Sequence, residues 1–137
     1  MGATVSSDTL DQTTYMAPFV DCVILVVDDD ELTRESAELL LTEYGYYVVT
    51  AGNATQALDR LADHPDIGLI FTDLQMPGAM DGKEMLHHLR LEGCDLPAIL
   101  TSGIGYTPWN LPSRTTFLSK PYKQSHLVNH IHELLAA

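Results

Sequence analysis

Cysteine, basic residues and long apolar runs are all scarce in this sequence, and each shortage argues against a class of protein. Only two cysteines occur among the 137 residues, Cys22 and Cys94, so two buried thiols are a simpler interpretation than a disulfide framework or a cysteine metal site. Lysine and arginine together number 7 against 19 aspartate and glutamate residues, which gives a net charge of −12. Such a chain repels nucleic acid and acidic lipid head groups, so we expect neither direct nucleic-acid binding nor membrane binding.

The amino-terminal residues contain no basic start and no apolar run, so neither a signal peptide nor a transmembrane span is expected there. We therefore expect a cytoplasmic protein. We also expect it to be a monomer or a weak dimer. Residues 1–20 are predicted to be a flexible polar extension, and residues 21–137 are predicted to form one domain that is large enough to bury its own core.

Two kinds of segment alternate after Asp21. Short, apolar, β-branched segments, typical of strands covered on both faces, occur at 23–27, 46–50, 67–71, 96–100 and around 116–118. Between them apolar residues recur with helical spacing, as in residues 37–44 before the terminating Gly45. The five alternations predict an α/β fold with a doubly wound, five-stranded parallel sheet in the order 2-1-3-4-5.

The fourth helix is expected to be short or absent. Residues 102–114, between the fourth and fifth strands, contain two glycines and two prolines and show no apolar period, which disfavours a full helix. The same stretch contains Trp109. Two interpretations of this side chain are open: it covers the core where a helix is missing, or it is an exposed anchor for a protein partner.

The candidate functional residues are those that end the strands. The carboxyl ends of parallel strands lie together at one edge of a sheet, so these residues are expected to be neighbours. These residues are Asp28, Asp29 and Asp30 after the first strand, then Asp73, Thr101 and Lys120 after the third, fourth and fifth. Carboxylates at one edge repel each other unless a cation neutralises them, and a set of oxygen ligands suits Mg²⁺. Beside such an ion, ionised Asp73 is a nucleophile that needs no general base, and Thr101 and Lys120 could each contact an oxygen of a transferred phosphoryl group.

Five short motifs occur in order at these strand ends. They are Val26-Val27-Asp28-Asp29-Asp30-Glu31, Thr72-Asp73-Leu74-Gln75-Met76-Pro77, Met80-Asp81-Gly82, Leu100-Thr101-Ser102 and Lys120-Pro121-Tyr122. With these motifs the chain resembles the receiver domains of two-component response regulators over nearly all of residues 21–137. The resemblance implies a flavodoxin-like fold and a signalling phosphoprotein. A histidine kinase or a histidine phosphotransfer protein would donate the phosphoryl group of its aspartyl phosphate, as a step of phosphorelay signal transduction.

The resemblance also implies roles for single residues. Asp73 is the phosphoacceptor. Asp29 and Asp73 ligate Mg²⁺ directly, Asp28 acts largely through a bound water, and the backbone carbonyl of Gln75 completes the protein's share. The protein is then not an enzyme, but a phosphoacceptor that assists its own phosphorylation and dephosphorylation.

Further roles implied by the resemblance concern the switch. Thr101 is the hydroxyl drawn toward the phosphoryl group, Lys120 is the counter-ion of that group, and Phe117 is the switch aromatic whose rotamer follows Thr101. The peptide bond between Lys120 and Pro121 is expected to be cis, as X-Pro bonds tolerate.

Two departures from the family bear on output. The loop 77–82 is one residue longer than the commonest form, and the missing fourth helix removes part of the surface through which family members usually signal. We expect phosphorylation-dependent protein contacts with a downstream target that the sequence does not identify. A stand-alone receiver is the expected arrangement, and a receiver fragment of a larger regulator or hybrid kinase is the alternative.

A haloacid-dehalogenase-like phosphatase is the strongest rival from another class. In that interpretation Asp28 is the nucleophile and Asp30 the acid/base. That family needs a further acidic strand end after the lysine, where this chain has only Glu133, on a predicted helix. The interpretation also leaves Asp73 without a role.

Two further alternatives share the predicted fold. A flavodoxin-like cofactor binder needs a Ser/Thr/Gly loop after the first strand to hold a phosphate, whereas three aspartates, 28–30, follow it here. A pseudo-receiver that docks constitutively is disfavoured because all the key site residues are present.

Simpler structural roles are open for several polar residues. One of the three aspartates, for which Asp30 is the candidate, is expected to cap the first helix. His126 and His130 have the spacing of a helical pair, but His132 points elsewhere, so a solvated helix face is favoured over a metal site.

Overall fold

The computed structural model describes residues 22–103 and 109–136. Within these residues lie five strands and four helices: β1 (Val23–Val27), α2 (Glu31–Glu43), β2 (Tyr47–Ala51), α3 (Ala54–Asp63), β3 (Ile67–Asp73), α4 (Gly82–Leu91), β4 (Ala98–Ser102), β5 (Thr115–Ser119) and α5 (Gln124–Ala136). The strands form one parallel sheet in the order β2-β1-β3-β4-β5. The predicted fold class is confirmed, whereas the extension predicted at residues 1–20 lies outside the described residues.

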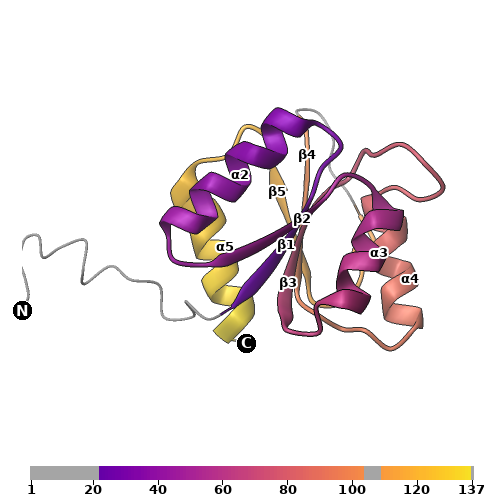
Figure 1. Cartoon of the computed structure of the whole chain (residues 1–137). Coiled ribbons are helices and arrows are strands. Elements are labelled where there is room, and N and C mark those ends of the chain that lie inside the picture. The colour runs from indigo at the N-terminus through magenta and orange to yellow at the C-terminus, as the bar shows by residue number, and fades with distance from the viewer. Residues whose placement is uncertain (1–21, 104–108, 137) are drawn as a thin grey trace, which may run out of the picture.

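Two helices cover each face of the sheet, α2 and α5 on one side and α3 and α4 on the other (Figure 1). Side chains alternate along the strands, so neighbouring residues belong to different cores. On β3, for example, Leu69 packs with Leu41 of α2 and Ile131 of α5, whereas Ile70 packs with Met85 of α4. Each of these side chains is fully buried, which gives the sheet a stable frame on both sides.

The second and fourth strands differ slightly from those expected. The fourth strand begins at Ala98 rather than at residue 96. Pro97 has no backbone N–H to donate to the ladder, although its carbonyl still accepts from Ile70 N at 3.0 Å. The second strand begins and ends one residue later than expected, at Tyr47 and Ala51.

The helix ends follow the chemistry of their capping residues. Asp30 caps α2 and accepts a hydrogen bond from Thr33 N, and Asn53 caps α3 and accepts from Gln56 N. Asp81 begins α4 with a capping box. Gly45 follows α2 with φ 98°, a backbone conformation that favours glycine. The predicted cap at Asp30 is confirmed.

Between β4 and β5, the described residues 109–114 contain no helix. Leu111 is half-buried against the α3/α4 core and Pro112 is buried, so this segment covers the part of the sheet where a helix was expected to be missing. Trp109 does not take part in that cover, because it is 77% exposed. Among the helices of residues 22–103 and 109–136, none has the length and apolarity needed to cross a membrane.

Candidate functional site

Alternation along the strands brings polar side chains to one side of the carboxyl edge of the sheet. On β3, Leu69 and Phe71 face the α2/α5 core and Asp73 continues the same row. Corresponding rows place Asp28 just after β1 and Thr101 on β4, on the same side. The strand register pairs Asp73 directly with Thr101. Buried apolar rows on neighbouring strands thus end in polar groups that lie side by side.

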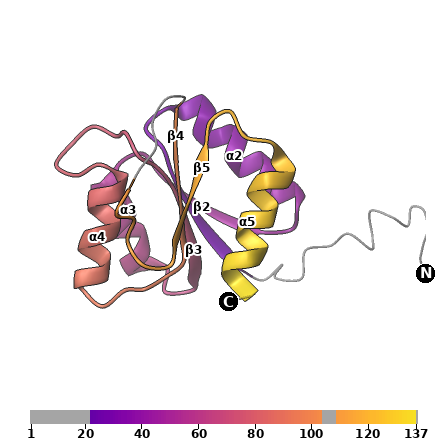
Figure 2. The same ribbon diagram turned by 180° about the vertical axis from the view of Figure 1, so that it is seen from behind.

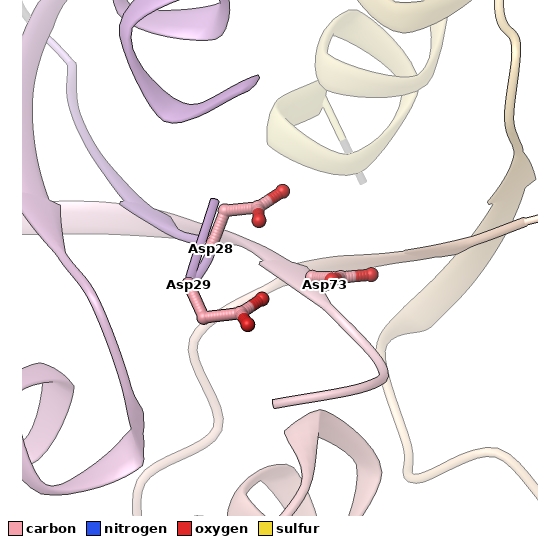
Figure 3. Close-up of side chains that lie close together, drawn as sticks. All are labelled: Asp28, Asp29 and Asp73. Atoms are coloured by element: carbon pink, nitrogen blue, oxygen red, sulfur yellow. The ribbon is translucent and has the colours of Figure 1, made fainter. Parts of the chain in front are cut away.

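Asp28, Asp29 and Asp73 form a cluster of carboxylates. One oxygen from each lies within 4.8 Å of the others, and the three side chains project to the same side (Figure 3). Asp28 is 5% exposed and Asp73 is 9% exposed, whereas Asp29 is open to solvent. In the described parts of the chain, no other group of three or more His, Cys, Asp or Glu residues is arranged to hold a metal ion.

Lys120 lies between the two buried carboxylates. Its Nζ is 3.4 Å from Asp28 Oδ2 and 3.5 Å from Asp73 Oδ1. Its backbone N–H donates to the carbonyl of Ser102 at 2.7 Å, which continues the pairing of β5 with β4 as far as the site. The Lys120–Pro121 peptide is cis, as predicted.

Two further contacts fix Asp28. Its Oδ1 accepts from the backbone N–H of Asp30 at 2.9 Å, and its carbonyl accepts from Arg34 Nη1 at 2.8 Å. Asp28 is therefore oriented by the turn into α2 as well as by Lys120. Asp30 is not a member of the cluster and caps that helix, and hydrogen bonds from Thr33 hold the pKa of its carboxyl below the ordinary value.

Burial raises the pKa of the Asp73 carboxyl above its ordinary value. The ammonium of Lys120 opposes this shift, and the negative charges of Asp28 and Asp29 add to it. The carboxylate of Asp73 is thus partly desolvated, and its charge depends on nearby cations. Binding of a cation, such as a metal ion, is therefore favourable at this site.

A small cavity of about 10 Å³ opens beside Asp73 and is also lined by Thr101, Lys120 and Tyr122. The hydroxyl of Thr101 is buried and has no hydrogen-bond partner among the described residues. A buried hydroxyl without a partner is unfavourable, so its presence in a native fold calls for a ligand or a functional role. Here the hydroxyl lies on the strand next to Asp73, where an incoming group could use it.

Tyr122 is a residue of this site to which the sequence motifs gave no role of its own. Its ring meets that of Phe71 edge-on, with centroids 5.9 Å apart. Burial, together with the charge of Asp28, raises the pKa of its phenol. Tyr122 also lines a larger open groove of about 580 Å³, outside the small cavity, together with Thr33, Gly103, Lys120 and Pro121. Its place two residues after Lys120 was the available sequence signal.

Gly82 is a second such residue, and it lies on the other side of Asp73. A Cβ atom there would lie 2.1 Å from the carbonyl oxygen of Asp73, so only glycine allows this close approach. The N–H of Gly82 donates to the carbonyl of Leu74 at 2.7 Å. The first turn of α4 is therefore in direct contact with the backbone that carries Asp73.

The structure brings together five of the predicted site residues: Asp28, Asp29, Asp73, Thr101 and Lys120. The other two are Phe117 and Gln75. Phe117 is half-buried against the α3/α4 core rather than in the cavity, and the side chain of Gln75 is exposed just after β3. The switch role of Phe117 and the metal-binding role of the Gln75 carbonyl stay predictions.

The histidines of α5 are not arranged as a metal site. His126 is exposed, and Nδ1 of His130 lies 3.0 Å from the hydroxyl of Thr116 on β5. With Asn129 and Glu133 they line an open, polar surface depression. This arrangement agrees with the predicted solvated helix face.

The donors of the carboxylate cluster fit a magnesium ion. The candidate ligands are all oxygens, two of the three carboxylates are buried, and Lys120 is the one ammonium within 4 Å of them among the described residues. Magnesium prefers a few carboxylates and keeps several waters, which suits a cluster with one solvent-exposed member. Asp28, Asp29 and Asp73 are the residues that would hold the ion.

Comparisons with known proteins show which family the chain is similar to. The sequence model of the family described as "response regulator receiver domain" matches residues 24–132. The C4-dicarboxylate transport transcriptional regulatory protein DctD of Pseudomonas aeruginosa is 32% identical over 124 residues, which are 87% of this chain and 26% of that protein. The probable transcriptional regulator ycf29 of Cyanophora paradoxa is 39% identical over 111 residues, or 77% of this chain and 52% of that protein. The chain thus spans between a quarter and about half of these relatives.

Two solved structures show the same architecture. The signal receiver domain of an HD domain-containing protein from Pseudomonas fluorescens Pf-5 matches with a TM-score of 0.77 and 26% identity, and the match covers 85% of this chain and 95% of that one. The receiver domain of the hybrid histidine kinase CckA matches with a TM-score of 0.70 and 30% identity, covering 82% and 98% of the two chains.

Proposed function

Because the chain belongs to the response regulator receiver domain family, we propose that Asp73 accepts a phosphoryl group from a phosphohistidine of a histidine kinase or a histidine phosphotransfer protein. A carboxylate oxygen of Asp73 forms the new bond to phosphorus. The bond from phosphorus to the donor's imidazole nitrogen breaks, and the imidazole leaves with that electron pair. The product is an aspartyl phosphate, on which contacts with other proteins depend.

The buried hydroxyl of Thr101 is the observation that carries this proposal. It has no partner among the described residues, and it lines the same cavity as Asp73 and Lys120. A phosphoryl group on Asp73 would offer an acceptor oxygen to this donor. The free energy that the unpaired hydroxyl costs in the resting state would then be recovered in the phosphorylated state.

Positive charge at the site supports the same chemistry. The ammonium of Lys120, already 3.5 Å from Asp73, is placed to hold one phosphoryl oxygen. Mg²⁺, when bound by Asp28, Asp29 and Asp73, would supply charge neutralisation for the phosphoryl oxygens. The protein's own groups then serve mainly to position the donor and to stabilise charge, as phosphoryl transfer requires. The chain assists its own phosphorylation and dephosphorylation in this way and turns over no separate substrate.

We propose protein contacts, rather than nucleic-acid contacts, as the output of the chain itself, because its net charge is −12. The relatives named as transcriptional regulators are longer than this chain. A stand-alone receiver and a receiver within a longer protein share this proposed chemistry. A cytoplasmic setting is proposed with it, because phosphohistidine donors and Mg²⁺ are available there.

Phosphorylation with labelled acetyl phosphate and Mg²⁺ tests the proposal. We expect label to be incorporated into the wild-type chain. Chelation of Mg²⁺ before the reaction should prevent this incorporation, and Asp73→Asn should not incorporate label. Asp30→Asn is the matched control, because it makes the same chemical change next to the site while asparagine keeps the cap of α2. Label that persists in Asp73→Asn would show that the phosphoacceptor is another residue.

The phosphatase interpretation makes the opposite prediction. It requires turnover of a phosphate ester that Asp28→Asn abolishes and Asp73→Asn leaves intact. The geometry disfavours it, because Asp30, its acid/base, is committed to the cap of α2 and Glu133 is exposed on α5. Assays of both variants with p-nitrophenyl phosphate separate the two mechanisms.

A further inference from the structure

The segment that connects β4 to β5 lies against α4, and we call its described residues 109–114 the connecting segment. The carbonyl of Trp109 accepts from Lys83 Nζ at 2.7 Å, near the start of α4. The carbonyl of Ser113 accepts from Arg90 Nε at 3.0 Å, near the end of α4. The connecting segment therefore runs along the helix, and a basic side chain holds each of its ends. Figure 2 shows this connection on the α3/α4 side of the sheet.

The two elements that meet at Trp109 are each joined to a different part of the phosphoacceptor site. The start of α4 contacts the backbone of Asp73 and Leu74 through Gly82, the residue before Lys83. The connecting segment leads into β5, which pairs with β4 beside Thr101 and its unpaired hydroxyl. A movement of β4 relative to Asp73 would therefore change the distance between Trp109 and Lys83.

Trp109 is held in place although it is exposed. Its side chain is 77% exposed, and the Lys83 ammonium lies 5.3 Å from the centre of its ring, within the range of a cation–π contact. One lysine thus binds both the carbonyl and the ring of the same residue. Exposed tryptophans are common anchors of protein interfaces, and the orientation of this one depends on Lys83.

We propose that Lys83 is a positioning residue that couples the exposed Trp109 to the phosphorylation state of Asp73. The inference rests on the proposed function. A phosphoryl group on Asp73 draws the Thr101 hydroxyl toward it and moves the end of β4, while the start of α4 stays with the backbone of Asp73. The contact between Lys83 and Trp109 then breaks, and the tryptophan is presented differently to a partner.

The fluorescence of Trp109 reports the coupling directly, because the chain has one tryptophan. Beryllofluoride with Mg²⁺, which mimics a phosphoryl group on aspartate, provides the activated state. On activation, we expect the tryptophan emission of the wild-type chain to change to the value that Lys83→Gln shows both with and without beryllofluoride. Lys83→Arg, which keeps a donor and a cation over the ring, should retain the response.

Controls separate this inference from the proposed function. Binding of beryllofluoride is measured independently by fluorine NMR in every variant, and Lys123→Gln removes an exposed lysine elsewhere, just before α5. If wild type and Lys83→Gln bind beryllofluoride and their emission is unchanged or changes equally, the coupling is disproved while Asp73 remains an acceptor. If beryllofluoride does not bind to the wild-type chain, the proposed function itself fails. A response lost in Lys123→Gln as well would also disprove a specific role of Lys83.

Discussion

The two faces of the sheet are covered by different means. On one face, α2 and α5 contribute fully buried side chains such as Leu41, Leu127 and Ile131. On the other face, α3 and α4 cover the sheet only in part, and the connecting segment covers the area near β5 with the half-buried Leu111. Phe117 on β5 is accordingly only half-buried on this side.

This difference separates the chemistry from its proposed output. Asp73 and Thr101 continue the rows that face α2 and α5, so the reacting groups rest on the core that these two helices cover. Trp109 lies on the other side, in a segment held mainly by two basic side chains of α4. Regions with fewer buried apolar contacts open at lower free energy. A conformational change that starts at Asp73 is therefore expected to appear first in the connecting segment.

Truncation of one apolar side chain on each face tests the comparison most strongly. Ile131→Ala removes a fully buried side chain and is expected to lower the free energy of unfolding by about 2–5 kcal/mol. Leu111→Ala removes a half-buried side chain of the connecting segment and should cost only about 1 kcal/mol. Urea unfolding of both variants measures the two losses. Equal losses would mean that the connecting segment packs as firmly as a helix.

The contact between α4 and Asp73 comes next in expected effect. Gly82→Ala places a Cβ 2.1 Å from a backbone oxygen, which cannot move aside as a flexible side chain could. We expect a loss of roughly 1–3 kcal/mol in unfolding free energy together with slower labelling of Asp73, because its backbone must shift. Gly103→Ala is the matched control, since none of the residues that the structure describes lies within 4 Å of its added Cβ. Normal stability and labelling in Gly82→Ala would show that α4 is not fixed to the site.

The strands and the site were the predictable parts of the molecule, because both follow from local patterns. Short apolar segments predicted the strands, and the rule that parallel strands end on one edge brought Asp73, Thr101 and Lys120 together. The contact of Lys83 with Trp109 could not be predicted in the same way. These residues are 26 positions apart, and only the path of the connecting segment along α4 brings them together. The close approach of Gly82 likewise depends on how α4 docks.

Thr101→Val tests the buried hydroxyl that links the two faces. Valine has nearly the same shape and removes a donor that has no partner among the described residues. We expect the resting chain to gain about 1 kcal/mol in unfolding free energy, whereas the Trp109 fluorescence response to beryllofluoride should be lost. Urea unfolding and fluorescence measure the two effects on the same samples. A variant that is less stable than wild type would show that the hydroxyl is already satisfied.

The smallest expected effect is the dependence of stability on the charge of Asp73. Burial raises the pKa of this carboxyl above its ordinary value of 3.8, so in the Mg²⁺-free protein the folded state holds its proton more tightly than the unfolded state does. As the pH rises through the ordinary value and then through the raised one, the unfolded chain ionises first, and the folded state loses stability.

Asp73→Asn removes this titration. The variant should match wild type at a pH below the ordinary carboxyl value and become the more stable protein as the pH rises toward neutrality. Urea unfolding across this range, without metal, measures the difference between the two proteins, in which the titration of the other groups largely cancels. Asp29→Asn is the matched control, because it makes the same chemical change at an exposed member of the same cluster. Added Mg²⁺ should stabilise wild type more than Asp73→Asn, since the ion favours the ionised carboxylate. A wild-type chain that is the more stable protein near neutral pH without metal would mean that Lys120 outweighs burial in setting the charge of the phosphoacceptor.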